Sequence, residues 1–162
     1  MRKASIIAAG ALFIVNDDAE LAATLDADGV HVGQDDAPPS AARAIVGPER
    51  LIGLSVSHLP EASAAEADPD VDHIGFGALF LTPTKPDAEP AGPDMLAEAR
   101  KLFSAPIVGI GGVTAANLGQ AFAAGADSVA VVSTIFSAAD PGAATRDLLA
   151  AIQRARQARQ VR

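Results

Sequence analysis

The sequence contains no cysteine, no tryptophan and no tyrosine, and only six of its 162 residues are phenylalanine. Without cysteine the chain can form no disulfide, no zinc–thiolate centre and no thiol nucleophile. Basic residues are also few, because 12 Lys and Arg stand against 20 Asp and Glu, which gives a formal net charge of −8. This balance argues against nucleic acid or an anionic membrane as a partner, because both require dense positive charge. An anionic small molecule would need local backbone amides or a divalent cation to bind.

Long apolar runs are absent as well, since no stretch reaches the roughly 18 apolar residues of a membrane span. The apolar run at residues 6–15 follows two basic residues and resembles a short signal peptide. It ends in Asn-Asp-Asp rather than at a small-residue cleavage site. We therefore interpret it as the end of a helix at residues 4–9, a cap at Gly10 and a buried strand. This interpretation and the lack of cysteine fit a cytoplasmic protein.

Short apolar runs alternate with helix-like segments along the whole chain. The runs are rich in β-branched residues and do not alternate in polarity, which is typical of parallel strands covered on both faces. We predict strands at residues 11–16, 29–32, 51–56, 73–80, 106–110 and 128–132, and helices at 18–25, 40–46, 61–66, 93–103, 115–124 and 143–159. Similar tetrapeptides, each with Asp at its second position, recur at 27–30, 71–74 and 126–129. Repeated βα units predict a single α/β domain over residues 1–162, either doubly wound or barrel-shaped.

Polar residues follow the first two predicted strands. Asn16 and Asp17 follow the first, and Asp35 and Asp36 follow the second. Ligands bind at the C-terminal ends of strands in such folds, so carboxylates at two adjacent ends could form an oxygen-rich Mg²⁺ site. The alternative is that these acids cap the following helices.

The third strand is followed by Ser55, Ser57 and His58. These side chains could bind a phosphate or a heterocycle, or they could belong to a solvated loop. His31 and His73 lie within or at the start of strands, where a structural histidine is the more common case. The spacing supports no Ser-His-Asp triad.

The fourth strand is followed by a Pro-stiffened segment that contains Thr82, Thr84 and Lys85. Two hydroxyls and an ammonium group on a stiff loop suit a phosphate or carboxylate, and little entropy is lost on binding. The alternative is a linker.

Two further turns, after the fifth and sixth strands, suit a phosphate. The first is the glycine-rich turn at residues 109–114, and the second contains Val132 and Ser133. Backbone N–H groups can approach a phosphate at such turns. Two of them after the last two strands match the phosphate site that follows strands seven and eight of (β/α)₈ barrels.

These segments, taken together, resemble successive signatures of the thiamine-phosphate synthase family. The segments are Phe-Ile-Val-Asn-Asp-Asp at 13–18, Gly-Val-His-Val-Gly-Gln-Asp-Asp at 29–36, Gly-Leu-Ser at 53–55, Gly-Phe-Gly at 75–77, Thr-Pro-Thr-Lys at 82–85, Val-Gly-Ile-Gly-Gly at 108–112 and Val-Val-Ser at 131–133. The resemblance implies a (β/α)₈ TIM-type barrel of which about six of the eight βα units are present. It also implies a transferase that joins 4-amino-2-methyl-5-hydroxymethylpyrimidine diphosphate to a thiazole phosphate and releases pyrophosphate.

The resemblance also implies the site residues. Asp17 and Asp36 would hold Mg²⁺ on the diphosphate, while Asn16 and Ser55 would contact the pyrimidine. Lys85 would neutralise the leaving group, so Lys85 and Ser55 are the expected catalytic residues. The thiazole phosphate would be held by Thr82, Thr84, Gly112, Val132 and Ser133.

Members of this family have two further βα units before the Asn-Asp strand, and the second ends in a basic segment that binds the diphosphate. No such segment occurs in this sequence. We therefore expect a fragment, a start assigned too late, a paralogue, or a barrel whose open edge is covered by a second copy. A thiazole tautomerase that uses His58 and a non-catalytic phosphate-binding protein are the alternative functions.

Overall fold

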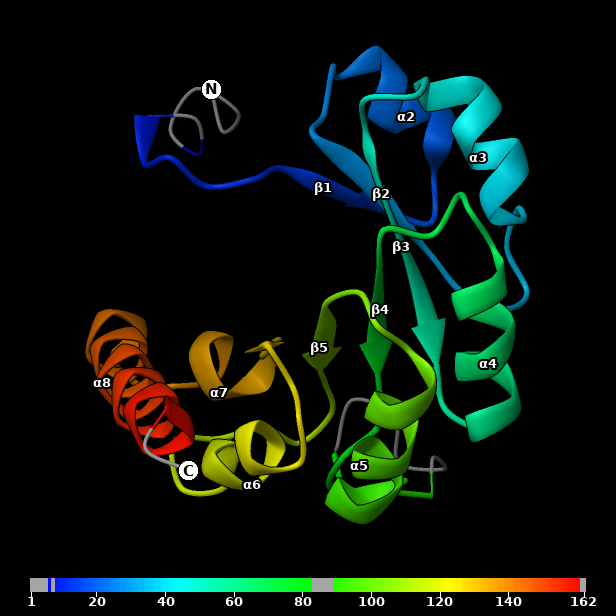
Figure 1. Cartoon of the computed structure of the whole chain (residues 1–162). Coiled ribbons are helices and arrows are strands. Elements are labelled where there is room, and N and C mark those ends of the chain that lie inside the picture. Colours follow the sequence, from blue (N-terminus) through cyan, green and yellow to red (C-terminus); the bar gives the residue numbers. More distant parts are fainter. Residues whose placement is uncertain (1–5, 7, 83–88, 161–162) are drawn as a thin grey trace.

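The computed structural model describes residue 6, residues 8–82 and residues 89–160. Six parallel strands form one curved sheet (Figure 1): β1 (Ile14–Asn16), β2 (Gly29–Val32), β3 (Leu51–Val56), β4 (His73–Phe76), β5 (Ile107–Gly109) and β6 (Ser128–Val129). Their order in the sheet is their order in the chain. A doubly wound sheet reverses its strand order at a switch point, so the uninterrupted order is that of an incomplete barrel. The predicted α/β fold with six barrel units is confirmed.

Helices lie along the outer side of the curved sheet (Figure 1): α2 (Ala19–Thr24), α3 (Pro39–Val46), α4 (Leu59–Ala67), α5 (Gly92–Leu102), α6 (Leu118–Ala123) and α8 (Pro141–Gln160). The one-turn helix α7 (Ser133–Phe136) follows the C-terminal end of β6. Asp18 caps α2 by accepting a hydrogen bond from the Leu21 N–H, and Gly47 ends α3 with a φ of +87°. No helix within the described ranges combines the length and the apolar content that a membrane span requires.

Several predicted boundaries were wrong, mostly at the end of the sheet that carries the loops. The predicted strand 73–80 ends at Phe76, and the predicted strand 128–132 ends at Val129. The predicted helix 115–124 begins only at Leu118. The four-residue helix α7 was not predicted, because one turn is too short to show a helical period.

The core lies between the sheet and its helices. Val30, Val32, Ile52 and Ile74 point from the strands into this layer and are fully buried. The helices meet them with small buried residues, Ala22, Ala42, Ala62, Ala65, Ala99 and Ala121. Alanine allows a close approach of helix to sheet. The alternate strand positions therefore face the other side, which is the barrel interior.

The repeated Asp has a common structural role at the N-terminal end of the sheet. Asp28 accepts a hydrogen bond from the Phe13 N–H (2.7 Å), Asp72 from the Ile52 N–H (2.8 Å) and Asp127 from the Ile107 N–H (3.0 Å). Each carboxylate thus accepts a hydrogen bond from a backbone N–H near the start of the strand that precedes it in the sequence. The repeat found in the sequence therefore links each of these strands to its neighbour.

Asp72→Ala is expected to lower the free energy of unfolding by about 2 kcal/mol. The substitution leaves the Ile52 N–H without its acceptor, and it removes the ion pair between Asp72 and Arg43 Nη2 (2.8 Å). Urea denaturation would measure the loss. Glu98→Ala is the control, because Glu98 pairs only with the exposed Lys101 among described residues. Equal midpoints for the two variants would contradict the assigned role.

Candidate active site

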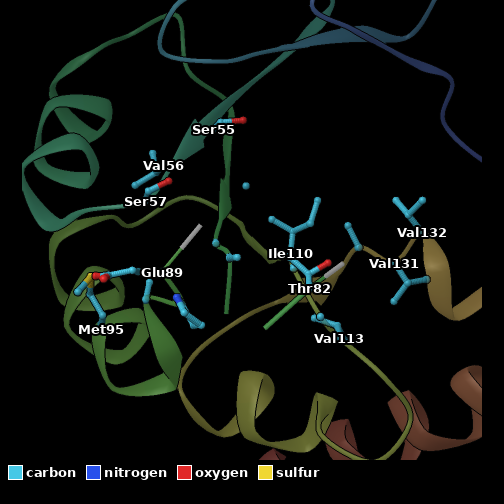
Figure 2. A pocket seen from close by; sticks show the side chains of 18 of the residues that line it. Ser55, Val56, Ser57, Thr82, Glu89, Met95, Ile110, Val113, Val131 and Val132 are labelled. Atoms are coloured by element: carbon cyan, nitrogen blue, oxygen red, sulfur yellow. The ribbon is translucent and has the colours of Figure 1, made fainter. Parts of the chain in front are cut away.

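A cavity of about 540 Å³ opens at the C-terminal ends of β3, β4, β5 and β6. Its lining comes from residues 55–58, 75, 77–78, 82, 89–91, 95, 110–113 and 130–134. Figure 2 shows Ser55 and Ser57 on one side and Val131 and Val132 on the other, with Thr82 and Ile110 between them. Ligands of parallel α/β folds bind at this end of the strands, so the cavity is the candidate active site.

The glycine turn after β5 forms part of the cavity wall. Gly111 and Gly112 have φ values of +91° and +63°, which glycine adopts without strain. The Phe80 N–H donates to the Gly111 carbonyl (3.0 Å), which ties the turn to the segment that follows β4. A Cβ atom on Gly112 would lie 2.4 Å from the Leu81 carbonyl oxygen. Glycine is therefore required here both for the conformation and for the close approach.

A second turn, after β6, lies beside the glycine turn and also lines the cavity. The Thr134 hydroxyl donates to the Val113 carbonyl (2.6 Å), which joins the two turns directly. Asn117 Nδ2 donates to the Gly112 carbonyl (2.9 Å), while its Oδ1 accepts from the Thr114 N–H (2.7 Å). Sequence reasoning missed Asn117 and Thr134. Their partners are backbone carbonyls and N–H groups, which leave no pattern in the sequence.

Five of the predicted substrate-binding residues line this one cavity: Ser55, Thr82, Gly112, Val132 and Ser133. Thr84 and Lys85, which were also predicted, lie outside the described residues. Sequence reasoning did not identify Glu89 and Met95, which also line the cavity, as does Ile110 of the predicted glycine-rich turn (Figure 2). Met95 and Ile110 add apolar surface for a ring, whereas Glu89 adds a carboxylate.

Asn16, Asp17 and Asp36 lie at the adjacent ends of β1 and β2, and none of them lines the cavity. The Asp17 N–H donates to the His31 carbonyl (2.7 Å), and Asp17 has a φ of +67°. Asp36 Oδ2 accepts from the Gly33 N–H (2.7 Å). In the part of the chain that the structure describes, no group of three or more His, Cys, Asp or Glu side chains is arranged to hold a metal. Asn16, Asp17 and Asp36 carry oxygen donors of the kind that Mg²⁺ prefers, so they are the residues that could hold this ion.

Ser55 is held by two side chains. Its hydroxyl lies 3.1 Å from His31 Nε2, and its carbonyl accepts from Gln34 Nε2 (2.6 Å). Burial, together with the smaller effect of the nearby His73, lowers the pKa of His31 to about 4. Burial also lowers the pKa of His73. Both rings are therefore neutral near pH 7.

The turn after β3 brings Ser57 and His58 to the cavity. The backbone N–H groups of both residues donate to Glu61 Oε2, at 2.6 and 3.2 Å. Glu61 thus fixes the first turn of α4 and the orientation of this wall.

Comparison with known proteins finds a matching family and relatives that share one described function. A family model described as thiamine monophosphate synthase matches residues 2–135. A thiamine-phosphate synthase of Laribacter hongkongensis is 50% identical over 142 residues, which are 87% of this chain and 66% of that protein. A thiamine-phosphate synthase of Roseiflexus sp. is 48% identical over 89% of this chain and 61% of its own length. The chain thus spans about two thirds, or less, of the length of these relatives.

A solved structure of a related protein has the same fold as this chain. The thiamine phosphate pyrophosphorylase of Pyrococcus furiosus superposes with a TM-score of 0.85 at 33% sequence identity. The match covers 93% of this chain and 71% of that one.

Proposed function

This chain belongs to the thiamine monophosphate synthase family, and we propose that it joins 4-amino-2-methyl-5-hydroxymethylpyrimidine diphosphate to a thiazole phosphate, with release of pyrophosphate. The observation that carries this proposal is that one cavity brings Ser55 together with the two turns after β5 and β6. Its volume of about 540 Å³ lies within the range of about 300–1,000 Å³ typical of small-molecule sites.

The thiazole phosphate would bind at the two turns. Gly112 and Ser133 both line the cavity, one on each turn, and Ser133 carries a hydroxyl that would contact the phosphate. Backbone donors suit a phosphate on a chain of net charge −8, because they provide local positive potential without basic side chains.

The pyrimidine would bind beside Ser55, with Asn16 as a further contact. The 4-amino group of the pyrimidine pushes electrons into the ring, the C–O bond to the diphosphate breaks, and a carbocation-like species forms. The thiazole nitrogen then forms the new C–N bond. The protein supplies no nucleophile in this reaction, only positioning and charge neutralisation.

The diphosphate would lie toward Asp17 and Asp36. A Mg²⁺ ion held by these carboxylates would neutralise its charge, and their oxygen donors suit that ion. Lys85, outside the described residues, is proposed to neutralise the leaving group as well.

The decisive experiment incubates the purified chain with both substrates and Mg²⁺ and assays thiamine phosphate. Product formation would establish the proposed reaction. Saturable thiazole-phosphate binding without product would instead favour a non-catalytic role. His58 lines the cavity, so an isomerase acting on the thiazole is the second candidate. Thiazole tautomerisation that His58→Ala abolishes would favour it.

Asp17→Asn and Asp36→Asn are each expected to raise the Mg²⁺ concentration for half-maximal activity about 10- to 100-fold, because one charged ligand is lost. Chelation of Mg²⁺ should abolish turnover of the unaltered protein. Asp35→Asn is the matched control, since Asp35 is an exposed neighbour to which the family resemblance assigns no metal contact. An unchanged Mg²⁺ titration in both site variants would remove these residues from the metal site.

A second copy of the chain is also part of the proposal. β1 and β6 are the end strands of the sheet among the described residues, and exposed strand edges favour association. Analytical ultracentrifugation would detect a dimer, and a monomer at all concentrations would rule it out.

A further inference from the structure

We infer that His31 is a positioning residue, whose imidazole fixes the Ser55 hydroxyl in the orientation that meets the pyrimidine substrate. This inference rests on the proposed function, because it assigns to Ser55 a contact with that substrate. It adds a residue that makes no contact with the cavity and acts only through Ser55.

The His31 ring occupies a space that glycine creates in the barrel interior. His31 pairs with Gly53 in the neighbouring strand, and Gly53 pairs in turn with His73. A Cβ atom on Gly53 would lie 2.2 Å from His31 Nδ1 and 2.3 Å from His73 Nε2. The two rings can therefore lean toward each other over Gly53, with their centroids 5.5 Å apart.

A second glycine lets the His31 ring reach Ser55. Ser55 pairs with Gly75, and a Cβ atom on Gly75 would lie 3.0 Å from His31 Cε1 and 3.2 Å from its Nε2. Because Gly75 has no side chain, the Nε2 atom of His31 lies 3.1 Å from the Ser55 hydroxyl.

Packing alone does not explain this arrangement. An imidazole in the interior beside two glycines could be replaced by an apolar ring if it only filled space. Instead, its Nε2 lies within hydrogen-bond distance of the hydroxyl of Ser55, which lines the cavity. Gln34, two residues beyond the end of the strand that contains His31, donates to the carbonyl of this serine. A serine hydroxyl rotates freely unless a partner fixes it, so His31 determines which way the oxygen presents itself to the ligand.

A double-mutant cycle in the full chain tests the inference. His31→Leu removes the ring nitrogen, and Ser55→Ala removes the hydroxyl. Each single variant is expected to lower kcat/KM for the pyrimidine diphosphate about tenfold, and the double variant no further than either one, because both remove the same oriented hydroxyl. KM for the thiazole phosphate should stay within about twofold of the starting value, because the two turns that bind it are not touched.

His31→Gln is the conservative variant, since its amide nitrogen can reach the position of Nε2. It should recover at least part of the loss, and it keeps the test valid if His31→Leu does not fold. A second cycle, with Ser57→Ala in place of Ser55→Ala, serves as the matched control. Ser57 also lines the cavity, but Ser55 is the hydroxyl beside His31, so the effects of the control pair should multiply.

The outcomes separate this inference from the proposed function. If the unaltered chain makes product but the effects of His31→Leu and Ser55→Ala multiply, His31 is only a core residue and the inference is overturned. If His31→Gln is as impaired as His31→Leu although both are folded by circular dichroism, the hydrogen bond is not the cause and the inference again fails. If the unaltered chain neither makes product nor binds the pyrimidine diphosphate by calorimetry, the proposed function fails and the role of His31 falls with it.

Discussion

Gly112→Ala is expected to raise KM for the thiazole phosphate about 100-fold and to lower the free energy of unfolding by roughly 2–3 kcal/mol. The new Cβ would lie 2.4 Å from the Leu81 carbonyl oxygen and 2.8 Å from that of Phe80, which are backbone atoms that cannot rotate away. The backbone φ of +63° also disfavours alanine. Either the glycine turn or the segment after β4 must move, and both line the proposed phosphate site. Steady-state kinetics and urea denaturation measure the two effects.

Gly119→Ala is the matched control for that prediction. Gly119 lies inside α6, and nothing stands within 4 Å of the position that its Cβ would take. Alanine is the better helix former, so this variant should be neutral or more stable by about 0.5–1 kcal/mol, with unchanged kinetics. If Gly112→Ala behaved like Gly119→Ala, the close approach and its role in binding would both be wrong.

Mild acid is expected to destabilise the fold through the two interior histidines. The pKa of His31 falls from 6.5 in the unfolded chain to about 4 in the fold, mainly because the ring is buried. Between these values the unfolded chain binds the proton and the folded chain does not. The stabilisation is therefore complete above pH 6.5 and is lost as the pH falls toward 4. Linkage gives on the order of 3 kcal/mol for such a shift, and partial exposure of the ring reduces this to about 2 kcal/mol. The pKa of His73 is lowered as well, so it acts in the same direction.

The contribution of the histidines is isolated by comparing variants, because carboxylates also titrate in acid. Unfolding free energies at pH 7 and at pH 4.5 should differ less in His31→Gln than in the unaltered protein, by about 2 kcal/mol. Gly119→Ala is the control, because it alters no titratable group and its pH profile should match that of the unaltered protein. Parallel pH profiles for all three proteins would show that proton uptake by the buried ring is not a cause of acid sensitivity.

The sequence predicted the elements well wherever a strong local pattern exists. The β-branched run at 29–32 became β2 with the predicted bounds, and the run at 51–56 became β3. Asp18 and Gly47 cap helices as expected. Boundaries failed beside the site, because the segment after Phe76 leaves the sheet while still donating to its neighbours: the Leu79 N–H, for example, donates to the Ile110 carbonyl (2.8 Å). Such bonds depend on a distant turn, which no local pattern encodes.

The candidate site shows the same division. Residues at strand ends, such as Ser55 and Ser133, could be identified because parallel strands bring their C-terminal ends to one side. Asn117 and Thr134 could not, because their partners are backbone groups several residues away or on another turn. The roles of Asp17 and Asp36 remain predictions that the Mg²⁺ titration will test.

The amino-acid sequence by itself determined the succession of βα units, the family and the strand ends at which the site lies, because hydrophobic pattern and turn chemistry are local properties. Only the tertiary structure decided between a barrel and a doubly wound sheet, since strand order is a property of neighbours in space. It alone also placed His31 beside Ser55, across two strands whose glycines leave room for the ring. A glycine in the sequence shows that a side chain is missing, and only the fold shows which residue uses the space.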